Sequence, residues 1–333
     1  MLRKLLSYII MASLVVISII IAGCGTEAAS TTTTTKQDDK VVNIATTPSS
    51  TWLPLYVAKQ NGWIEEALKD KGITVHWTEF PTGPAMMESF AAGQQDFGTV
   101  GDAFVSAIAS GQKETIVATA TSGLALAILV PPNSPIKTPA DLKGKKIGTI
   151  IGGSPHHLLK YVFQPLGLTL SDVQLVNITP GDAATVLTSG NVDAVAVWEP
   201  HVTKLEKDGI AKPIVTGEDV NFHGVSEIFA RNEYLKAHPE VVKIILQQYQ
   251  RGVEELAAHP EKYADLLAKP FGVDKDVLLS VSKKYTFLEP TNDANIAELQ
   301  DTVSFFKSIG AIQNEVQIKE YVDNTLINEV LKK

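Results

Sequence analysis

Four short turns rich in Ser, Thr, Gly and Pro hold the residues best placed for chemistry. They contain Ser49, Ser50, Thr51, Trp52, Thr82, Gly83, Pro84, Gly101, Asp102, Gly153, Ser154, His156 and His157. Each turn is followed by a helix-forming stretch, so the free N–H groups and the dipole of a helix N-terminus favour a bound anion. Hydroxyl groups add donors, and glycine lets a ligand approach the backbone. The sequence therefore predicts a site for a small anion.

Simpler roles remain open for these residues. Ser50, Thr82, Asp102 and Ser154 could each merely cap a helix, and the two histidines could lie on the surface. Asp102 is expected to cap a helix over 103–110, and Ser50 or Thr51 one that opens at Pro54.

A second group of candidates follows predicted strands. Val192 to Val197 is a short apolar run typical of a buried strand, and Trp198-Glu199-Pro200 ends it. Ligands of open α/β sheets bind at the carboxyl ends of strands, so Trp198, Glu199 and Ser122 are further candidates. Trp198 could equally belong to the core, and Glu199 could be solvated or cap the next helix.

Two segments of the chain share a pattern. Residues 187–201 contain a helix end, Gly190, an aspartate at Asp193, an apolar strand and a polar turn, and residues 90–102 repeat this with Gly93 and Asp96. We expect the two aspartates to fix the turns before their strands. The repeat predicts two similar lobes of α/β structure with a ligand cleft between them.

The expected strands and helices fill these lobes in order. Strands are predicted at 41–45, 73–80, 97–100, 115–121, 124–130, 146–150, 173–178 and 192–197. Chain crossings between the lobes are expected near 124–130 and 222–229. Residues 232–333 read as helices interrupted by prolines, and we expect them to pack around the first lobe without contributing chemistry.

The first forty residues differ from the rest. Residues 1–24 combine a basic start, an apolar run and a closing Cys24, which is typical of a bacterial lipoprotein signal with its lipidated cysteine; an uncleaved anchor helix is the alternative. Residues 25–40 resemble a flexible tether. The single cysteine rules out an internal disulfide and a cysteine-based metal site. The net charge of −8 argues against nucleic-acid binding.

Motifs along nearly the whole mature chain resemble the substrate-binding proteins of ABC importers for aliphatic sulfonates and taurine, within the nitrate/sulfonate/taurine group. They are Thr82-Gly83-Pro84, Gly93-x-x-Asp96-Phe97-Gly98 with Gly101-Asp102, Ser134-Pro135-Ile136-Lys137, Asp141-Leu142-Lys143-Gly144-Lys145-Lys146, Ser154-x-His156, Gly190-Asn191-Val192-Asp193-Ala194 with Trp198-x-Pro200, and His238-Pro239-Glu240-Val241-Val242-Lys243. The resemblance implies a type II periplasmic-binding-protein fold, with lobe I at 41–127 and 226–333, lobe II at 128–225, and a two-strand hinge.

The resemblance also implies partners. We expect a small anionic ligand, an ABC permease with its ATPase, and a membrane reached through the lipid anchor. We expect a monomer that lies outside the cytoplasm and has no cofactor or metal. Two departures bear on the ligand: Gly153 and Pro155 flank Ser154 where relatives often have consecutive serines, and the first turn lacks a glutamine that many relatives carry.

A sulfonate is the expected ligand, because it stays ionised and needs donors around its head group. If the ligand is taurine, its ammonium needs an acceptor or an aromatic face, which Asp102, Glu199 or Trp198 could supply. Nitrate, a thiamine-precursor pyrimidine and an aromatic sulfonate are alternatives. The rival of another class is an enzyme like the thiamine-pyrimidine synthase, which the missing cysteine cluster disfavours.

Overall fold

The computed structural model describes residues 40–332 except 124–125 and 223. The predicted signal with Cys24 and nearly all of the predicted tether lie outside the described residues, as do Leu124, Ala125 and His223 of the predicted crossings. Within that described part, none of the helices has the length and apolar content needed to cross a bilayer.

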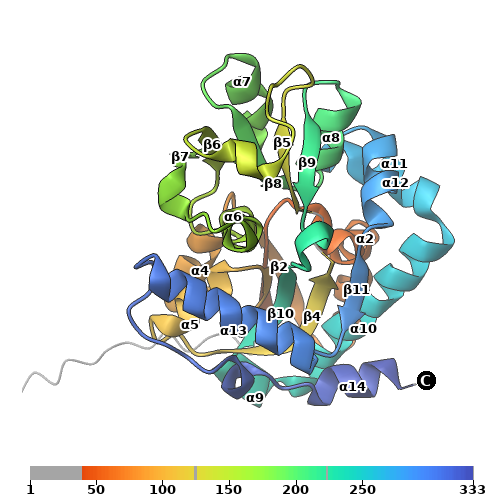
Figure 1. Ribbon diagram of the computed structural model, residues 1–333. Coiled ribbons are helices and arrows are strands. Elements are labelled where there is room, and N and C mark those ends of the chain that lie inside the picture. The colour runs from red at the N-terminus through yellow and green to blue at the C-terminus, as the bar shows by residue number, and fades with distance from the viewer. Residues whose placement is uncertain (1–39, 124–125, 223, 333) are drawn as a thin grey trace, which may run out of the picture. The chain divides into compact units, whose positions relative to one another are not determined.

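Two β-sheets form the framework (Figure 1). The sheet of lobe I has the order β11-β4-β10-β3-β1-β2, and that of lobe II has the order β7-β6-β8-β5-β9. The strands of lobe I are β1 (Val41–Thr46), β2 (Thr74–Glu79), β3 (Phe97–Val100), β4 (Glu114–Ser122), β10 (Val225–Arg231) and β11 (Thr286–Glu289). The strands of lobe II are β5 (Leu126–Val130), β6 (Lys146–Thr149), β7 (Gln174–Asn177), β8 (Ala194–Trp198) and β9 (Lys212–Thr216).

The chain passes from one sheet to the other twice, between β4 and β5 and between β9 and β10. In lobe I, β1 is parallel to β2 and β3, whereas β10 and β11 run antiparallel to their neighbours. Lobe II repeats this with parallel β6, β7 and β8 and an antiparallel β5. The predicted two-lobed α/β architecture with two crossings is confirmed.

Helices cover both faces of each sheet. Around lobe I lie α2 (Leu53–Gln60), α3 (Trp63–Lys69), α4 (Gly83–Ala91), α5 (Ala103–Ala109), α9 (Asn232–Ala237), α10 (Pro239–Ala258), α11 (Pro260–Phe271), α13 (Asp293–Ser308) and α14 (Thr325–Leu331). Around lobe II lie α6 (Ser154–Phe163), α7 (Ala183–Thr188), α8 (His201–Lys207) and α12 (Lys275–Ser282).

Alternation along the strands sends neighbouring side chains to opposite cores. Ile228 packs with α2, α3 and α10, whereas Phe229, one residue on, packs with α4, α5 and α13. In lobe II, Ile128 and Ala196 face α6, and Leu129 and Val197 face α7 and α8.

The repeat predicted from the sequence is visible in the hydrogen bonds. Gly93 and Gly190 both have φ of 71° and end their helices. The Asp96 carboxylate accepts the backbone N–H of Asn43 at 2.9 Å, and Asp193 accepts that of Lys146 at 2.8 Å. Each aspartate lies just before its own strand and accepts a hydrogen bond from a neighbouring parallel strand, β1 for Asp96 and β6 for Asp193.

The C-terminal region departs from the expectation in part. Helices α10 and α11 begin at the prolines 239 and 260 as expected, but the strand β11 was not predicted. Helix α12 buries Val277 and Val281, together with Tyr285, in the core of lobe II. The expectation that this region packs around lobe I holds for α10, α11, α13 and α14 but not for all of α12, because Val277 and Val281 find their apolar partners in lobe II.

One contact sets the position of α2 against α10. A Cβ atom added at Gly252 would lie 2.2 Å from the carbonyl oxygen of Pro54. The two helix backbones therefore touch at this point, and only glycine fits there.

Candidate ligand site

The first polar turn is a 3₁₀ helix, η1 (Ser50–Trp52), that leads directly into α2. The Ser49 hydroxyl accepts the N–H of Thr51 and caps this turn, whereas α2 has no side-chain cap. The expected cap by Ser50 or Thr51 is wrong, because the extra 3₁₀ turn moves the cap one residue earlier. Trp52 is buried, and its indole N–H donates to the Thr47 hydroxyl at 3.1 Å.

Ser50 makes contact with lobe II. Its buried hydroxyl donates to the carbonyl oxygen of Glu199 at 3.3 Å and lies 3.4 Å from the Tyr285 hydroxyl. The first turn of lobe I therefore meets the end of β8 in lobe II.

The second and third turns lie side by side. Thr82 caps α4 by accepting the N–H of Ala85 at 3.4 Å, so its capping role is confirmed. A Cβ atom at Gly83 would lie 2.9 Å from side-chain atoms of both Val100 and Ala103. Gly83 and the following Pro84 thus begin α4 against the end of β3 and the start of α5, beside Gly101 and Asp102.

Asp102 does not cap α5: its side chain makes no capping hydrogen bond, and its backbone is already helical. The prediction of an N-cap is wrong because the carboxylate turns away from the α5 amides. Burial raises the pKa of Asp102, while a hydrogen bond with Ser154 and the nearby His157 oppose that rise. Both of those residues belong to lobe II, so Asp102 is a point of contact between the lobes.

The N-terminus of α6 provides the lobe II side of this contact. Ser154 is the first helical residue and is nearly buried, at 8% exposure. The N–H groups of His156 and His157 donate to the carbonyl oxygen of Gly153. Because the Ser154 hydroxyl bonds Asp102, the donor left at this helix end is the N–H of Ser154.

His156 carries a donor of its own. Its buried Nδ1 accepts the N–H of Gly152 at 3.1 Å, which places the ring proton on Nε2. Within the described residues, Nε2 has no hydrogen-bond partner. Burial, followed by the charge of His157, lowers the pKa of His156 to about 4, so the ring is neutral at physiological pH.

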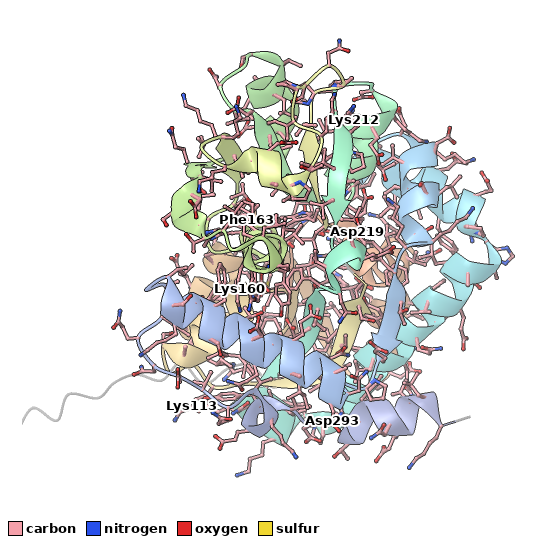
Figure 2. All side chains as sticks on the ribbon, viewed as in Figure 1. Lys113, Lys160, Phe163, Lys212, Asp219 and Asp293 are labelled. Atoms are coloured by element: carbon pink, nitrogen blue, oxygen red, sulfur yellow. The ribbon has the colours of Figure 1, made fainter. Side chains whose placement is uncertain are left out.

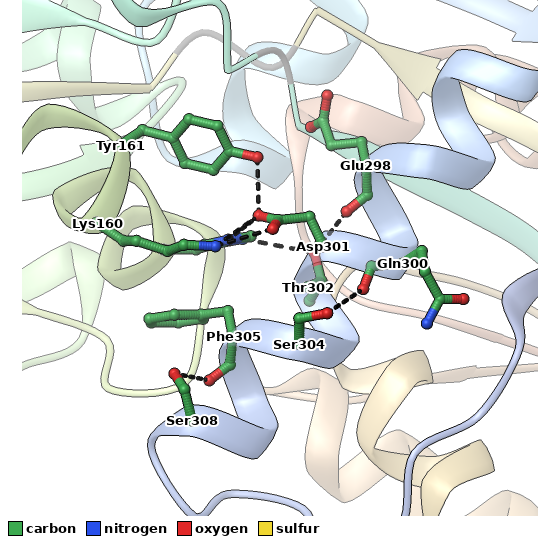
Figure 3. A network of polar contacts seen from close by, with 10 residues as sticks. Lys160, Tyr161, Glu298, Gln300, Asp301, Thr302, Ser304, Phe305 and Ser308 are labelled. Carbon is green, nitrogen blue, oxygen red and sulfur yellow. Dashed lines mark hydrogen bonds and ion pairs between the residues drawn. The ribbon is translucent and has the colours of Figure 1, made fainter. Parts of the chain in front are cut away.

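His157 belongs to a polar network between α6 and α13 (Figure 3). Its Nε2 donates to Asp301 at 2.9 Å, and Lys160 and Tyr161 of the same helix donate to that carboxylate at 2.9 and 2.8 Å. Lys160 extends from α6 towards α13 in Figure 2. Hydrogen bonds from these three side chains, that of His157 first, hold the pKa of Asp301 well below its usual range.

Aromatic rings pack beside this polar network. The His157 ring stacks on Phe305 of α13, with centroids 4.4 Å apart and planes at 9°. Phe222 lies edge-on to His157 and also touches Tyr161. We call these four rings and Asp301 the α6–α13 seam.

Glu199 is fully engaged by protein groups. Its buried carboxylate accepts the N–H and the hydroxyl of Thr203, at 2.9 and 2.8 Å, and pairs with Lys284. Trp198 packs against the lobe II core around β8 and α6, and Ser122 ends β4, where it pairs with Val225. Glu199 thus accepts hydrogen bonds at the start of α8, in agreement with the alternative prediction that it caps the helix after β8.

The structure therefore shows two contacts across the lobe boundary, one between Ser50 and the Glu199 carbonyl and one between Asp102 and Ser154, which is followed along α6 by His156. Four contributors were not predicted: Lys284, Tyr285, Asp301 and Glu227. Glu227 could have been noticed in the sequence, because a carboxylate within the apolar run of 225–230 is costly to bury. Asp301 lies in an ordinary amphipathic helix, so nothing in the sequence distinguishes it from any other aspartate on a helix.

Comparison with known proteins places this arrangement in a family. The NMT1/THI5-like family model matches residues 49–263, more than half of the chain. A Bacillus subtilis protein named "Putative aliphatic sulfonates-binding protein" is 32% identical over 96% of this chain and 96% of its own.

Two solved structures share the fold. The periplasmic aliphatic sulphonate binding protein from Escherichia coli superposes with a TM-score of 0.78 at 29% identity, covering 87% of this chain and all of that one. The alkanesulfonate-binding protein from Xanthomonas axonopodis pv. citri, bound to MOPS, gives 0.77 at 26% identity, with 86% and 99% covered. With two lobes of matching topology and a family model over most of its length, the chain belongs to the NMT1/THI5-like family and has its periplasmic-binding-protein fold.

Proposed function

We propose that this protein is the solute-binding component of an ABC importer and holds an aliphatic sulfonate between its lobes. It then delivers the sulfonate to a membrane permease driven by an ATPase. The names of the related proteins from B. subtilis and E. coli support this substrate class. The shared fold supports capture between two lobes.

The observation that carries the proposal is the N-terminus of α6, which faces lobe I at Asp102. A sulfonate accepts hydrogen bonds and donates none. Ser154 offers its N–H, and its hydroxyl can turn from Asp102 to an arriving anion. The Nε2–H of His156 has no acceptor among the described residues. Together with the helix dipole, these donors fit an anion that remains ionised at every physiological pH.

The proposed site includes groups from both lobes. Ser50 of η1 meets the Glu199 carbonyl, and the turns at Gly83–Pro84 and Gly101–Asp102 line the lobe I side. Thr51 and Trp52 of η1 are buried and fix this turn to the core of lobe I. Trp198 packs against the core of lobe II and fixes the end of β8 there. We assign Glu199 to the start of α8 rather than to the ligand.

A thermal-shift panel tests the substrate class. Dialysed protein starting at Gly25 would be heated with ethanesulfonate, longer alkanesulfonates, taurine, nitrate, sulfate and a hydroxymethylpyrimidine. A ligand that binds only the folded form stabilises it by about 2.7 kcal/mol at one hundred times its Kd. We expect sulfonates to raise the melting temperature in proportion to the logarithm of their concentration.

Variants connect the result to α6. Ser154→Ala should weaken sulfonate binding about tenfold, the usual effect of losing one hydrogen bond to a charged group. Ser189→Ala, an exposed serine of the same lobe, serves as the control and should bind like the wild type. A shift with nitrate or the pyrimidine alone would reject the sulfonate and keep the fold.

We further propose that the chain performs no chemistry on its ligand and works as a monomer. Among the described residues, no group of three or more His, Cys, Asp or Glu side chains is arranged to hold a metal ion. Incubation with a bound sulfonate followed by NMR of the released ligand tests the first point, since a new resonance would indicate turnover. Light scattering tests the second.

We also propose that Cys24 is lipidated and anchors the protein outside the cytoplasm. The sequence pattern of residues 1–24 supports this. Cell fractionation of the full chain should place it with the membrane, and Cys24→Ala should release it or retain the unprocessed precursor. Identical fractionation and size of the two forms would reject the anchor.

A further inference from the structure

Phe305 of α13 packs against both histidines at the start of α6. Its ring lies edge-on to His156, with centroids 5.2 Å apart and planes at 75°, and it stacks on His157. Phe305 is part of the core of lobe I, whereas α6 packs on the sheet of lobe II. The ring therefore crosses the lobe boundary directly beside the donors that we assign to the sulfonate.

This packing buries those donors. His156 is 3% exposed and Ser154 is 8% exposed, and the Nε2 atom of His156 is itself buried. A ligand arriving from solvent cannot reach these atoms while Phe305 lies against α6. The α6–α13 seam must therefore separate before an anion enters the proposed site.

Asp301, one helical turn before Phe305, ties the same two helices together. Its carboxylate accepts hydrogen bonds from His157 at 2.9 Å, from Lys160 at 2.9 Å and from Tyr161 at 2.8 Å, all of them on α6 (Figure 3). Hydrogen bonds to an ionised acceptor are stronger than those between neutral groups. The His157 side chain is fully buried, so its bond to Asp301 is also shielded from water.

The groups of the seam satisfy one another. Phe222 lies edge-on to His157 at a centroid distance of 4.9 Å and is tilted against Tyr161 at 4.7 Å, which completes the aromatic packing around the Asp301 carboxylate. The donors, the acceptor and the rings all belong to the protein, so the seam forms without any contribution from a ligand. Separation of the lobes would leave the carboxylate without its donors and expose the rings to water.

We propose that the α6–α13 seam is an autoinhibitory contact that holds the two lobes closed in the absence of ligand. A ligand enters only during brief openings of the seam, and the seam re-forms behind it. This inference rests on the proposed function, because it concerns access to the sulfonate site.

The inference has a kinetic signature. Because the seam is present both before and after binding, weakening it speeds entry and release by the same factor. The Kd then stays nearly constant, since the free and the bound protein lose the same contact. A seam that formed only around a bound ligand would affect release alone and weaken the affinity.

The first experiment measures the position of the lobes without ligand. The chain from Gly25 contains no cysteine, so spin labels can be attached specifically through Ser189→Cys in lobe II and Ser304→Cys on α13, both at exposed positions. Double electron–electron resonance then reports the distance between the lobes. We expect one distance in the wild-type sequence that ethanesulfonate leaves unchanged, and a second population at another distance when Asp301→Asn is added.

The second experiment measures the two rate constants with ethanesulfonate by stopped-flow fluorescence of tryptophan, since Trp198 lies at the end of β8 beside the lobe boundary. Asp301→Asn should raise the association and dissociation rate constants together by about tenfold and leave the Kd within about twofold of the wild type. Tyr161→Phe removes one hydrogen bond and should raise both about threefold.

Asp293→Asn is the matched control. Asp293 is an exposed aspartate at the start of the same helix, away from Lys160 (Figure 2). This variant should keep both rate constants and the single distance. Circular dichroism spectra establish that each variant is folded before its rates are interpreted.

A wild-type distance that changes when ethanesulfonate is added would overturn the inference, because the free lobes would then be open. So would a faster release with unchanged entry in Asp301→Asn, or unchanged rate constants in both seam variants. If no sulfonate binds at all, the proposed function fails, whereas the distance measurement still decides whether the seam closes the free protein.

Discussion

Substitution of Gly252 tests how the far side of lobe I positions the first polar turn. The new Cβ of Gly252→Ala would stand 2.2 Å from the carbonyl oxygen of Pro54, whereas ordinary contacts begin at 3.4 Å. Helices α2 and α10 must therefore separate by about 1.2 Å, the difference between these two distances. Because α2 follows η1 without a linker, Ser50 moves with it.

The magnitude follows from two opposing terms. Overpacking of this kind costs about 1–3 kcal/mol, whereas alanine in a helix is favoured over glycine by about 0.5–1 kcal/mol. We expect a net loss of about 1–2 kcal/mol. For a protein of this size it lowers the melting temperature by roughly 2–8 °C.

Circular dichroism at 222 nm during heating measures this loss, with and without the sulfonate identified in the panel. Gln247→Ala, on the exposed side of the same helix, is the control and should be neutral or slightly stabilising. Helix propensity alone predicts that Gly252→Ala stabilises the protein. A melting temperature at or above that of the wild type would therefore refute the packing argument.

Three further predictions concern carboxylates. Asp301→Asn should cost about 1–2 kcal/mol at pH 7 in urea unfolding. Because the folded pKa of Asp301 is lowered, the wild type holds this stability above the unfolded pKa of about 3.9 and loses it as the pH falls further; parallel pH profiles of the two proteins below pH 4 would contradict it. Lys284→Met removes the cation beside the buried Glu199 and should cost about 2–3 kcal/mol, less than a fully buried pair because Thr203 still donates two hydrogen bonds; adding Glu199→Gln should restore part of the loss, and a purely additive double variant would exclude the pairing. Asp96→Asn should cost about 2–3 kcal/mol, since Asp96 is buried and also pairs with an arginine, whereas exposed Asp193→Asn should cost about 1 kcal/mol. Equal losses of unfolding free energy for the two variants, measured in guanidinium, would contradict this argument from burial.

Local patterns predicted the architecture well. The Gly-x-x-Asp repeat predicted both lobes. In each copy the glycine ends a helix, and the aspartate three residues later accepts a hydrogen bond from a neighbouring strand.

Contacts between distant segments were the part that the sequence could not supply. Asp102 resembled an N-cap because its position before an apolar run is typical of one. Its actual neighbours, Ser154 and Glu227, come from other strands and helices and depend on how the lobes meet. The same reason hid Asp301, whose partners lie about 140 residues earlier in the chain.

The α6–α13 seam has a consequence for the heat of binding. Its stacked rings lie outside the proposed ligand contacts, yet separation of the lobes would expose them to water. Hydration of apolar surface carries a large heat capacity. If ligand binding closes the lobes, the heat-capacity change will be far more negative than the ligand's own small surface can explain, and removing the Phe305 ring will shrink it. The temperature dependence of the binding enthalpy thus measures how far the lobes travel.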